Sequence, residues 1–424
     1  MNKPEDSIRA ASCADDYDPN SMPVAKAREF IARFLTPISA IERLHIRSAL
    51  GRVLAADVIS PLNVPSHDNS AMDGYALRFA DLKSAGETRL KITGTAFAGV
   101  PFQGIAKQGE CVRIMTGAVM PKGLDTIVMQ EHAKADGDHV TVGGGHKQGQ
   151  HLRLAGEDLK TGQVALKRGL QVRPAEVGLI ASLGINEVSV YRRLRVAFFS
   201  TGDELVSIGS TLGEGQIYDS NRYTINGMLQ RLGCEVIDMG VVRDDPQLIE
   251  QAFQSAAQTA DVVITSGGVS VGEADFVKAM LDRLGEVVFW KIAMKPGRPL
   301  AYGHIGGAHF FGLPGNPVSV MVTFYQFVRD ALLTLSGRDP LPSVPSFRVP
   351  CTTPLKKAPG RTEFQRGVLT QDAAGNWSVA VTGEQGSGIL RSMCEANCFI
   401  ILPTDQGNVG AGTLVEVQVM EGVI

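Results

Sequence analysis

The stretch with the clearest chemistry is residues 261–275, DVVITSGGVSVGEAD. Its apolar run is typical of a buried strand, and a helical pattern begins near Asp275. Between them, a loop of small residues carries Gly267, Gly268 and Gly272. Glycines between a strand and a helix let backbone N–H groups approach a phosphate or another oxyanion. Asp275 would repel that anion, so we expect a bound Mg²⁺ between the two.

Charged residues follow the neighbouring apolar runs in the same way. Lysine and arginine side chains in the WKIAMKPGRP segment supply positive charge suited to phosphate or an oxyanion. Carboxylates in STGDEL, RDDP and GEAD supply the hard oxygen ligands that Mg²⁺ prefers. The cations are Lys291, Lys295 and Arg298, and the carboxylates are Glu204, Asp244 and Asp275.

A further apolar run ends in GLPGNPVS, residues 312–319. Asn316 is a good N-cap, and Pro317 suits the first helical position, so a helix N-terminus is expected there as an anion site. Each pattern taken singly also fits a capped turn, a solvated loop or an ordinary helix start. Their joint occurrence favours a single site.

The elements that position these residues form an alternating series. From residue 195 to 343, strands and helices alternate, with helices beginning near Asn221, Pro246, Asp275 and Asn316. This order predicts a doubly wound, mostly parallel α/β sheet, with the ligand crevice at the carboxyl ends of its strands. There is no Walker A sequence, and no GxGxxG opens the first helix, which disfavours an ATPase or a dinucleotide-dependent redox enzyme. The residues alone indicate a Mg²⁺-assisted enzyme acting on a phosphate-bearing ligand.

Other parts of the chain differ in texture. Short β-like runs separated by Gly, Pro and Asp predict a β-rich domain over 62–162 and a C-terminal β-barrel or sandwich over 344–424. Residues 23–61 and 163–194 are expected to form an elongated connecting domain, with a helix in 23–42 that is interrupted at Pro37. The polar residues 1–22 are expected to be a disordered tail.

Composition limits the protein class. A chain of 424 residues exceeds one ordinary core, and its net charge of −3 argues against a nucleic-acid-binding surface. No apolar run approaches the roughly 20 residues of a membrane span, and residues 1–22 carry no apolar segment of a signal peptide. The six cysteines are scattered without a CxxC pair, which favours reduced thiols. We expect a cytoplasmic protein without nucleic-acid or membrane partners.

Seven motifs together carry a resemblance to a known family. DNSAMDGYA (68–76, within an odd polar run), RIMTGAVMP and AGEDLKTGQ precede the glycine loop, and STGDEL, KPGRP and GLPGNPVS lie around it. In this order they resemble the MoeA family of molybdenum insertases, whose eukaryotic relative is the E domain of gephyrin. The resemblance covers the chain from about residue 23 to its end. It implies an α/β domain like that of MogA within a four-domain subunit.

The resemblance also implies a reaction. Family members take adenylylated molybdopterin and molybdate, release AMP and insert molybdenum into the dithiolene, with Mg²⁺ as the assisting cation. An elongated homodimer is implied, with the cleft between the α/β domain of one subunit and the β-rich domain of the other. The adenylyltransferase that makes the substrate and the apo-molybdoenzymes that receive the product are implied as partners.

The site residues implied by the resemblance are taken from its motifs. As catalytic residues it gives Asp73, Thr116, Asp158, Glu204, Asp244 and Asp275. As ligand-binding residues it adds Lys291, Lys295, Pro314, Pro317, Arg366 and Ser387 to the glycines, Arg298 and Asn316 named above. Among these we expect Asp244, Asp275 and Glu204 to hold Mg²⁺, the cations to hold phosphate or molybdate, and Thr116 and Asp158 to orient the pterin or the entering oxyanion.

Two other functions share part of these features. A molybdopterin adenylyltransferase resembles the α/β section alone, and the flanking β-rich segments argue against it. A non-catalytic scaffold like gephyrin would use the same fold, but every expected acidic and basic position is filled here. The sequence leaves open the preference between molybdate and tungstate, and which molybdoenzymes are served.

Overall fold

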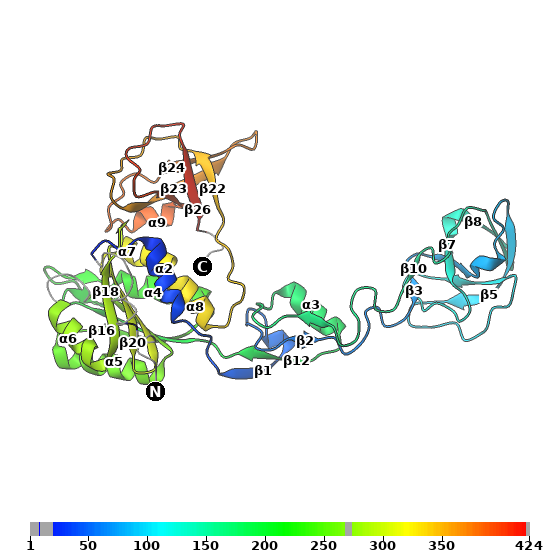
Figure 1. The fold of residues 1–424 in the computed structure, drawn as a ribbon, viewed down its shortest axis with the longest axis horizontal. Helices are drawn as coiled ribbons and strands as arrows, with labels where there is room; N and C mark the ends of the chain where they lie inside the picture. Colours follow the sequence, from blue (N-terminus) through cyan, green and yellow to red (C-terminus); the bar gives the residue numbers. More distant parts are fainter. Residues whose placement is uncertain (1–7, 9–19, 268–273, 421–424) are drawn as a thin grey trace.

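The structure, a computed structural model, describes Ile8 and residues 20–267 and 274–420. Gly268 and Gly272 lie outside the described residues, and so does the side chain of Asp275. The chain is elongated (Figure 1), with an α/β unit (195–343) and a C-terminal unit (344–420) at one end. A narrow connecting unit leads to a β-rich unit (62–162) at the other end.

The α/β unit is built on a six-stranded sheet in the order β16-β13-β17-β21-β20-β18. The strands are β13 (Arg195–Thr201), β16 (Glu235–Val242), β17 (Val262–Ser266), β18 (Gly285–Lys291), β20 (Pro299–Ile305) and β21 (Ala308–Leu313). Neighbours from β16 to β21 are parallel, which confirms the mostly parallel sheet that the sequence predicts. Strand β20 is antiparallel to both of its neighbours because short connections join it to each of them. After two reversals, β18 points the same way as β21.

Helices cover both faces of this sheet, as the alternating apolar residues of its strands require. Phe198 and Ile264 face one helical layer, while their neighbours Phe199 and Val263 face the other. One layer contains α4 (Ser220–Arg231), α7 (Pro317–Thr323), the π-helical turn η5 (Phe324–Val328) and α8 (Arg329–Leu335). The other contains α5 (Pro246–Thr259) and α6 (Ala274–Leu284). Four predicted helix starts are therefore confirmed.

The continuous run Pro317–Leu335 passes a test of length and composition for a membrane-spanning helix. However, 72% of its apolar window is buried inside the protein. It is therefore accounted for as a core helix of the α/β unit.

The N-terminal residues differ from the expectation. Helix α2 (Val24–Arg33) packs on the α/β unit and not in the connecting unit, with the Phe30 ring 5.0 Å from that of Trp290. The apolar side of α2 packs there against the core of the α/β unit. Met22 pairs with the end of β18, donating its N–H to the Lys291 carbonyl (3.1 Å). Ile8 is only 1% exposed and donates its N–H to the Glu286 carboxylate at 2.9 Å. A wholly disordered tail is therefore wrong for Ile8 and Met22.

The connecting unit is a pair of two-stranded ladders with one helix. Its elements are β1 (Ile41–His45) with β12 (Glu187–Tyr191), β2 (Val58–Ile59) with β11 (Val164–Leu166), and α3 (Pro174–Ser182). It meets the α/β unit at a tight joint: a Cβ on Gly337, which has φ +85°, would lie 2.3 Å from the Tyr191 ring. The joint is closed further by the Asp339 N–H, which donates to the Gly169 carbonyl at 3.0 Å.

The β-rich unit is a six-stranded sheet in the order β7-β4-β6-β5-β9-β8, with a small β3-β10 ladder beside it. Its strands are β3 (Asn69–Ser70), β4 (Gly74–Leu77), β5 (Thr88–Ala96), β6 (Glu110–Ile114), β7 (Thr126–Met129), β8 (Ala133–Asp136), β9 (His139–Val142) and β10 (Leu152–Arg153). The predicted β-like runs over 88–142 are strands here.

The C-terminal unit shares a sheet with the α/β unit. Strand β19 (Met294–Lys295) pairs in parallel with β23 (Thr362–Gln371), so the two units meet beside Lys295. The sheet continues through β25 (Cys398–Leu402), β26 (Leu414–Val419) and β22 (Ser346–Pro350), while β24 (Trp377–Val381) flanks β23. One residue beyond β22, Cys351 bridges to Val379 in β24. A short helix, α9 (Arg391–Glu395), lies next to β23.

Candidate active site

Five strands of the α/β unit end at the same edge of its sheet. Strands β13, β16, β17, β18 and β21 all point in one direction, so the loops that follow Thr201, Val242, Ser266, Lys291 and Leu313 meet there. This edge carries the predicted carboxylates, cations and glycines of the α/β section. An edge of this kind is where open parallel sheets bind their ligands.

The first loop residue after β17 has to be glycine. Gly267 has φ +90°, and a Cβ there would lie 2.6 Å from the Thr201 carbonyl oxygen. Only a residue without a side chain lets this loop pass so close to the end of β13. This close approach explains why the predicted loop needs glycine at position 267. Gly268 and Gly272 lie outside the described residues.

Two predicted carboxylates stand on adjacent loops. Glu204 and Asp244 are both exposed, and the Asp244 N–H donates to the Asp203 carboxylate at 3.3 Å, which ties the two loops together. Gly202 has φ +146°, and a Cβ there would lie 2.6 Å from a carboxylate oxygen of Glu204. The third carboxylate, Asp275, belongs to the first turn of α6, and its side chain is not among those that the structure describes.

Of the predicted cations, Lys291 is the last residue of β18, and Lys295 and Arg298 follow it, with Lys295 next to the C-terminal unit. Lys295 Nζ is 3.3 Å from Oε1 of Glu363, a residue of β23 that is nearly buried. The other oxygen of Glu363 accepts from the Gln365 amide at 3.0 Å. The Lys295 side chain itself is half exposed, so Glu363 orients its ammonium without enclosing it. Arg298 is exposed and donates to the Asn20 carbonyl at 3.4 Å.

The start of α7 is less open than the sequence predicts. Asn316 stands at the N-cap and Pro317 at the first helical position, but the Asn316 side chain makes no capping hydrogen bond. The Val318 N–H donates to the Ser387 carbonyl at 3.1 Å, so a loop of the C-terminal unit already satisfies one free donor. Pro314 belongs to the turn just before this helix.

Arg366 has a different position from the one expected of a ligand contact. It is 1% exposed, and burial lowers its pKa to about 10. Its guanidinium donates to the Ser392 hydroxyl and to the Gly386 carbonyl, each at 3.0 Å. Arg366 therefore holds the loop that carries Ser387, and it acts on the site through that loop.

Sequence reasoning missed a group of buried polar residues at the same edge. Asn221 donates from Nδ2 to the Ser266 hydroxyl (2.8 Å) and to the Gly315 carbonyl (2.6 Å), which links two of the strand ends. Among the described residues, four buried polar atoms here have no hydrogen-bond partner: Ser200 Oγ, Thr201 Oγ1, Asp219 Oδ2 and Asn221 Oδ1. Buried polar atoms are nearly always paired, so this group is suited to a polar ligand. The signal was the DSN run of 219–221, which predicted only a helix start.

The remaining predicted residues lie in the β-rich unit. Thr116 donates both its N–H and its hydroxyl to one oxygen of Asp73, each at 2.7 Å. These two donors hold the pKa of Asp73 below its ordinary value, so the carboxylate stays charged. Asp158 is exposed in a turn of the same unit, where its N–H donates to the Val64 carbonyl at 3.0 Å.

The candidate site is therefore divided within one chain. The β-rich unit, which contains Asp73 between β3 and β4 and Thr116 after β6, lies at one end of the elongated chain in Figure 1. The α/β unit, which contains Glu204, Lys295 and the other strand-end residues, lies at the opposite end. The connecting unit stands between the two groups, so a single chain does not bring them together.

Comparison with known proteins decides the family. Residues 22–184 match the MoeA N-terminal region (domain I and II), residues 197–334 a probable molybdopterin binding domain, and residues 348–420 the MoeA C-terminal region (domain IV). A molybdopterin molybdenumtransferase of Haemophilus influenzae is 48% identical over 89% of this chain and 93% of its own length. The chain belongs to the MoeA family.

Other MoeA relatives agree with this assignment. A molybdopterin molybdenumtransferase of Synechococcus elongatus is 37% identical over 89% of this chain and 94% of its own length. A crystal structure of a molybdopterin biosynthesis MoeA protein from Pyrococcus horikoshii covers 95% of this chain and all of that chain, with a TM-score of 0.82 and 28% identity. The resemblance inferred from the seven motifs is confirmed.

Proposed function

We propose that this chain is a molybdopterin molybdenumtransferase. In this proposal it takes adenylylated molybdopterin and molybdate, releases AMP and leaves molybdenum in the dithiolene. The main support is structural: five strands end at one edge of the sheet, where carboxylates and cations follow them. The chain is also 48% identical, over nine-tenths of its length, to a curated enzyme of that name.

The cations and the unpaired polar atoms have separate roles in this proposal. Lys291, Lys295 and Arg298 attract the anionic groups, namely molybdate and the phosphates of the substrate. Ser200, Asp219 and Asn221 form hydrogen bonds to the neutral polar edge of the ligand, because their buried atoms are otherwise unpaired.

The donor set also fits Mg²⁺. Glu204 and Asp244 present carboxylates from two tied loops, and Mg²⁺ in enzymes commonly uses one or two carboxylates together with substrate phosphates. Within the part of the chain that the structure describes, no cluster of three acidic, His or Cys residues offers a closed metal site, which agrees with a shared one. Glu204, Asp244 and Asp275 would hold the ion, and it would neutralise charge on the departing AMP.

A homodimer would unite the two halves of the site. In this arrangement, the Asp73–Thr116 pair of one chain faces the strand-end residues of the other. A shallow groove on the α/β unit offers a surface on which a second copy of the chain could dock. It is lined by Tyr223, Gly227 and Arg231 of α4 and by Met321 and Tyr325 of the α7–η5 run, and Tyr223 is 43% exposed.

Several finer features belong to the same proposal. We propose a cytoplasmic enzyme that receives its substrate from an adenylyltransferase and passes its product to apo-molybdoenzymes. We also propose that the C-terminal unit closes as a barrel. The Cys351–Val379 bridge, which connects the edge beyond β22 to β24, supports this closure.

The test is molybdate-dependent release of AMP. Purified protein would be mixed with adenylylated molybdopterin and Mg²⁺, with and without molybdate, and the product would be tested for reactivation of an apo-molybdoenzyme. Glu204→Gln should abolish the release. Glu87→Gln, which alters an exposed carboxylate of the β-rich unit, is the matched control and should leave it unchanged.

The alternatives give other results. Consumption of ATP with formation of the adenylylated substrate would identify an adenylyltransferase. Tight binding of the substrate without AMP release, in wild type and variant alike, would identify a scaffold. Either result would overturn the proposal.

A further inference from the structure

A small cavity lies at the joint between the connecting unit and the α/β unit. Its volume is about 40 Å³, and residues of both units line it. From the connecting side come Arg52, Gln171 and the linker residues Arg192 and Arg193. From the α/β side come the segment around Gly233 and the end of α8, including Arg338. None of these residues belongs to the candidate active site.

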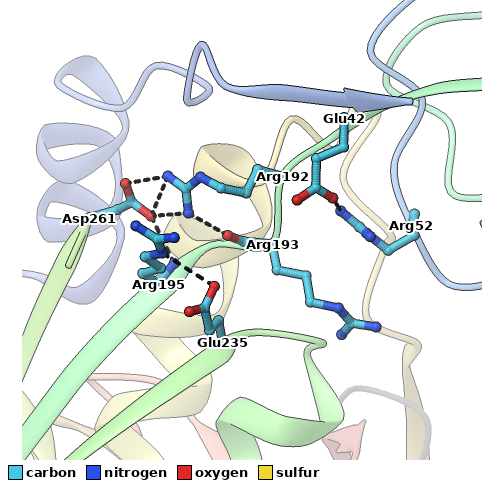
Figure 2. Close-up of polar contacts among 7 residues, drawn as sticks. All are labelled: Glu42, Arg52, Arg192, Arg193, Arg195, Glu235 and Asp261. Carbon is cyan, nitrogen blue, oxygen red and sulfur yellow. Dashed lines mark hydrogen bonds and ion pairs between the residues drawn. The ribbon is translucent and has the colours of Figure 1, made fainter. Parts of the chain in front are cut away.

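Two of the four arginines that line the cavity are neutralised by carboxylates. Arg192 forms a bidentate ion pair with Asp261, its closest contact being 2.8 Å, and Arg52 donates to Glu42 at 2.6 Å (Figure 2). Both pairs belong to the framework of the joint. They leave the net charge of the cavity unchanged, because each carboxylate offsets one guanidinium.

The other two arginines have only neutral partners among the described residues. Arg193 donates to the Gly233 carbonyl at 2.9 Å, and Arg338 donates to the Gln171 amide oxygen at 2.7 Å. In Figure 2, the Arg193 side chain runs away from Asp261, on the side of the linker where Arg52 lies. Each guanidinium has five N–H donors, so several are available to a ligand.

Other charged groups near the cavity occur as ion pairs. Burial lowers the pKa of Arg338; Arg173 lowers it further, while Glu176, the partner of Arg173, raises it. The nearby Arg195 and Glu235 form an ion pair of their own at 3.2 Å, so together they add no net charge. The cavity therefore has an excess of two positive charges, held by planar donors that suit tetrahedral oxyanions.

We propose that this cavity is a binding site for an inorganic tetrahedral dianion, such as phosphate, sulfate or molybdate, that cross-links the connecting unit to the α/β unit. The dianion accepts hydrogen bonds from Arg193 on the linker and from Arg338 at the end of α8. Its two charges match the two guanidiniums that have no carboxylate. The small volume excludes a nucleotide.

The test is hydrogen exchange of the full-length protein with and without the dianion. Sodium phosphate and sodium molybdate would be added separately, and sodium chloride at matched ionic strength is the salt control. Peptides that cover residues 51–53, 192–195 and 333–338 should be protected by the dianions and not by chloride. Calorimetric titration of the same samples gives the affinity.

Variants locate the effect. Arg193→Gln should weaken phosphate binding at the joint about 10-fold, since one charge-assisted hydrogen bond contributes roughly 1.5 kcal/mol. Arg193 is exposed and has one backbone contact, so this variant should fold even where an Arg193→Gln/Arg338→Gln pair does not. Arg195→Gln is the matched control because it changes a linker arginine that does not line the cavity.

Each outcome either supports the site or overturns it. Protection of the three peptides in wild type and Arg195→Gln, and its loss in Arg193→Gln, supports the site, and the more protective dianion identifies the preferred ligand. Equal protection by chloride, equal protection in Arg193→Gln, or no protection in wild type overturns it. Failure of the molybdenumtransferase proposal would leave these readouts unaffected, because none of them measures activity.

Discussion

Asn221 connects two loops of the candidate active site with a single amide. Its two N–H donors go to Ser266 and Gly315, which leaves its carbonyl oxygen buried and unpaired. A side chain used in this way fixes the distance between loops and offers an acceptor to the ligand. Removal of the amide should therefore affect both substrate binding and the geometry of the reacting groups.

We expect Asn221→Ala to lower kcat/KM about 100-fold, because it removes two buried hydrogen bonds and one ligand contact. Steady-state AMP release measures the effect. Asn226→Ala, which changes another asparagine of the same helix, is the control. Equal losses in both variants would show that α4 is merely sensitive to substitution.

Glu363 holds Lys295 from across the seam between two units. In Glu363→Gln the Lys295 ammonium loses its charged partner but keeps its own charge, so its position becomes less defined. We expect KM for molybdate to rise several-fold, with a smaller change in kcat. Glu395→Gln alters an exposed carboxylate of α9 and should leave both constants unchanged. An unchanged KM in Glu363→Gln would separate Lys295 from oxyanion binding.

Asp73 has a lowered pKa because Thr116 donates its N–H and its hydroxyl to the carboxylate. A carboxyl of this kind favours the folded state above its ordinary pKa and loses that contribution as the pH falls through its lowered value. Thr116→Val keeps the N–H and removes the hydroxyl, so the pKa of Asp73 should rise part of the way back. Titration followed by carboxyl NMR measures it. Thr141→Val, in β9 of the same unit, should not move it.

At the scale of elements, the connecting unit depends on the start of α3. The Glu176 carboxylate caps the helix there: it accepts from the Arg173 backbone N–H at 2.9 Å and from the Arg173 guanidinium at 2.7 Å. This lowers the pKa of Glu176 from 4.5 to about 2. The cap should therefore stabilise the unit fully above pH about 4.5 and lose its effect as the pH falls toward 2.

We expect Glu176→Gln to lower the free energy of unfolding by about 1 kcal/mol at neutral pH. The difference from wild type should shrink in acid, where Glu176 itself becomes protonated. Urea unfolding at several pH values measures both effects. Glu187→Gln, in β12 of the same unit, is the control, since Glu187 pairs only loosely with Arg43 at 3.7 Å. A constant difference across the pH range would contradict this explanation.

The elements of the α/β unit were predictable because their apolar residues alternate or recur at helical spacing. β13, β17 and the helix starts at Pro246 and Pro317 follow directly from such patterns. The reversal at β20 depends on a two-residue turn at Gly306–Gly307, which a mostly parallel pattern did not indicate. The position of α2 could not be predicted either, because an apolar stripe does not specify which unit covers it.

The site was predictable where charged or glycine residues follow a strand. Glu204, Lys295 and Gly267 lie at the strand ends that the sequence indicated. Two features depended on tertiary packing and had no local signal. One is the burial of an unpaired oxygen on each of Ser200 and Asp219, and the other is the enclosure of Arg366 beneath the loop that it holds.

At the scale of the whole molecule, the divided site makes a prediction about mixed chains. Asp73→Asn and Glu204→Gln should each be inactive alone, since each would damage both sites of the proposed homodimer. When the two are co-expressed, random pairing makes half of the dimers mixed, and each mixed dimer has one intact site. Activity should return to about a quarter of wild type.

The measurement is AMP release by the co-purified mixture. A double variant with both substitutions in one chain, co-expressed with either single variant, is the control and should stay inactive. Absence of recovery in a mixture shown to contain mixed dimers would mean that the two groups of residues do not act in one site.

The joint at Gly337 and Tyr191 has a mechanical consequence. The connecting unit acts as an arm that is pivoted where this glycine lies against the tyrosine ring, and the β-rich unit, which contains Asp73, lies at its other end (Figure 1). The displacement of a rigid arm at its tip is its length multiplied by the angle of rotation at the pivot. An added methyl group at Gly337 would turn the pivot slightly and move the tip by much more. A packing contact at the opposite end of the arm thus determines where the Asp73 carboxylate lies.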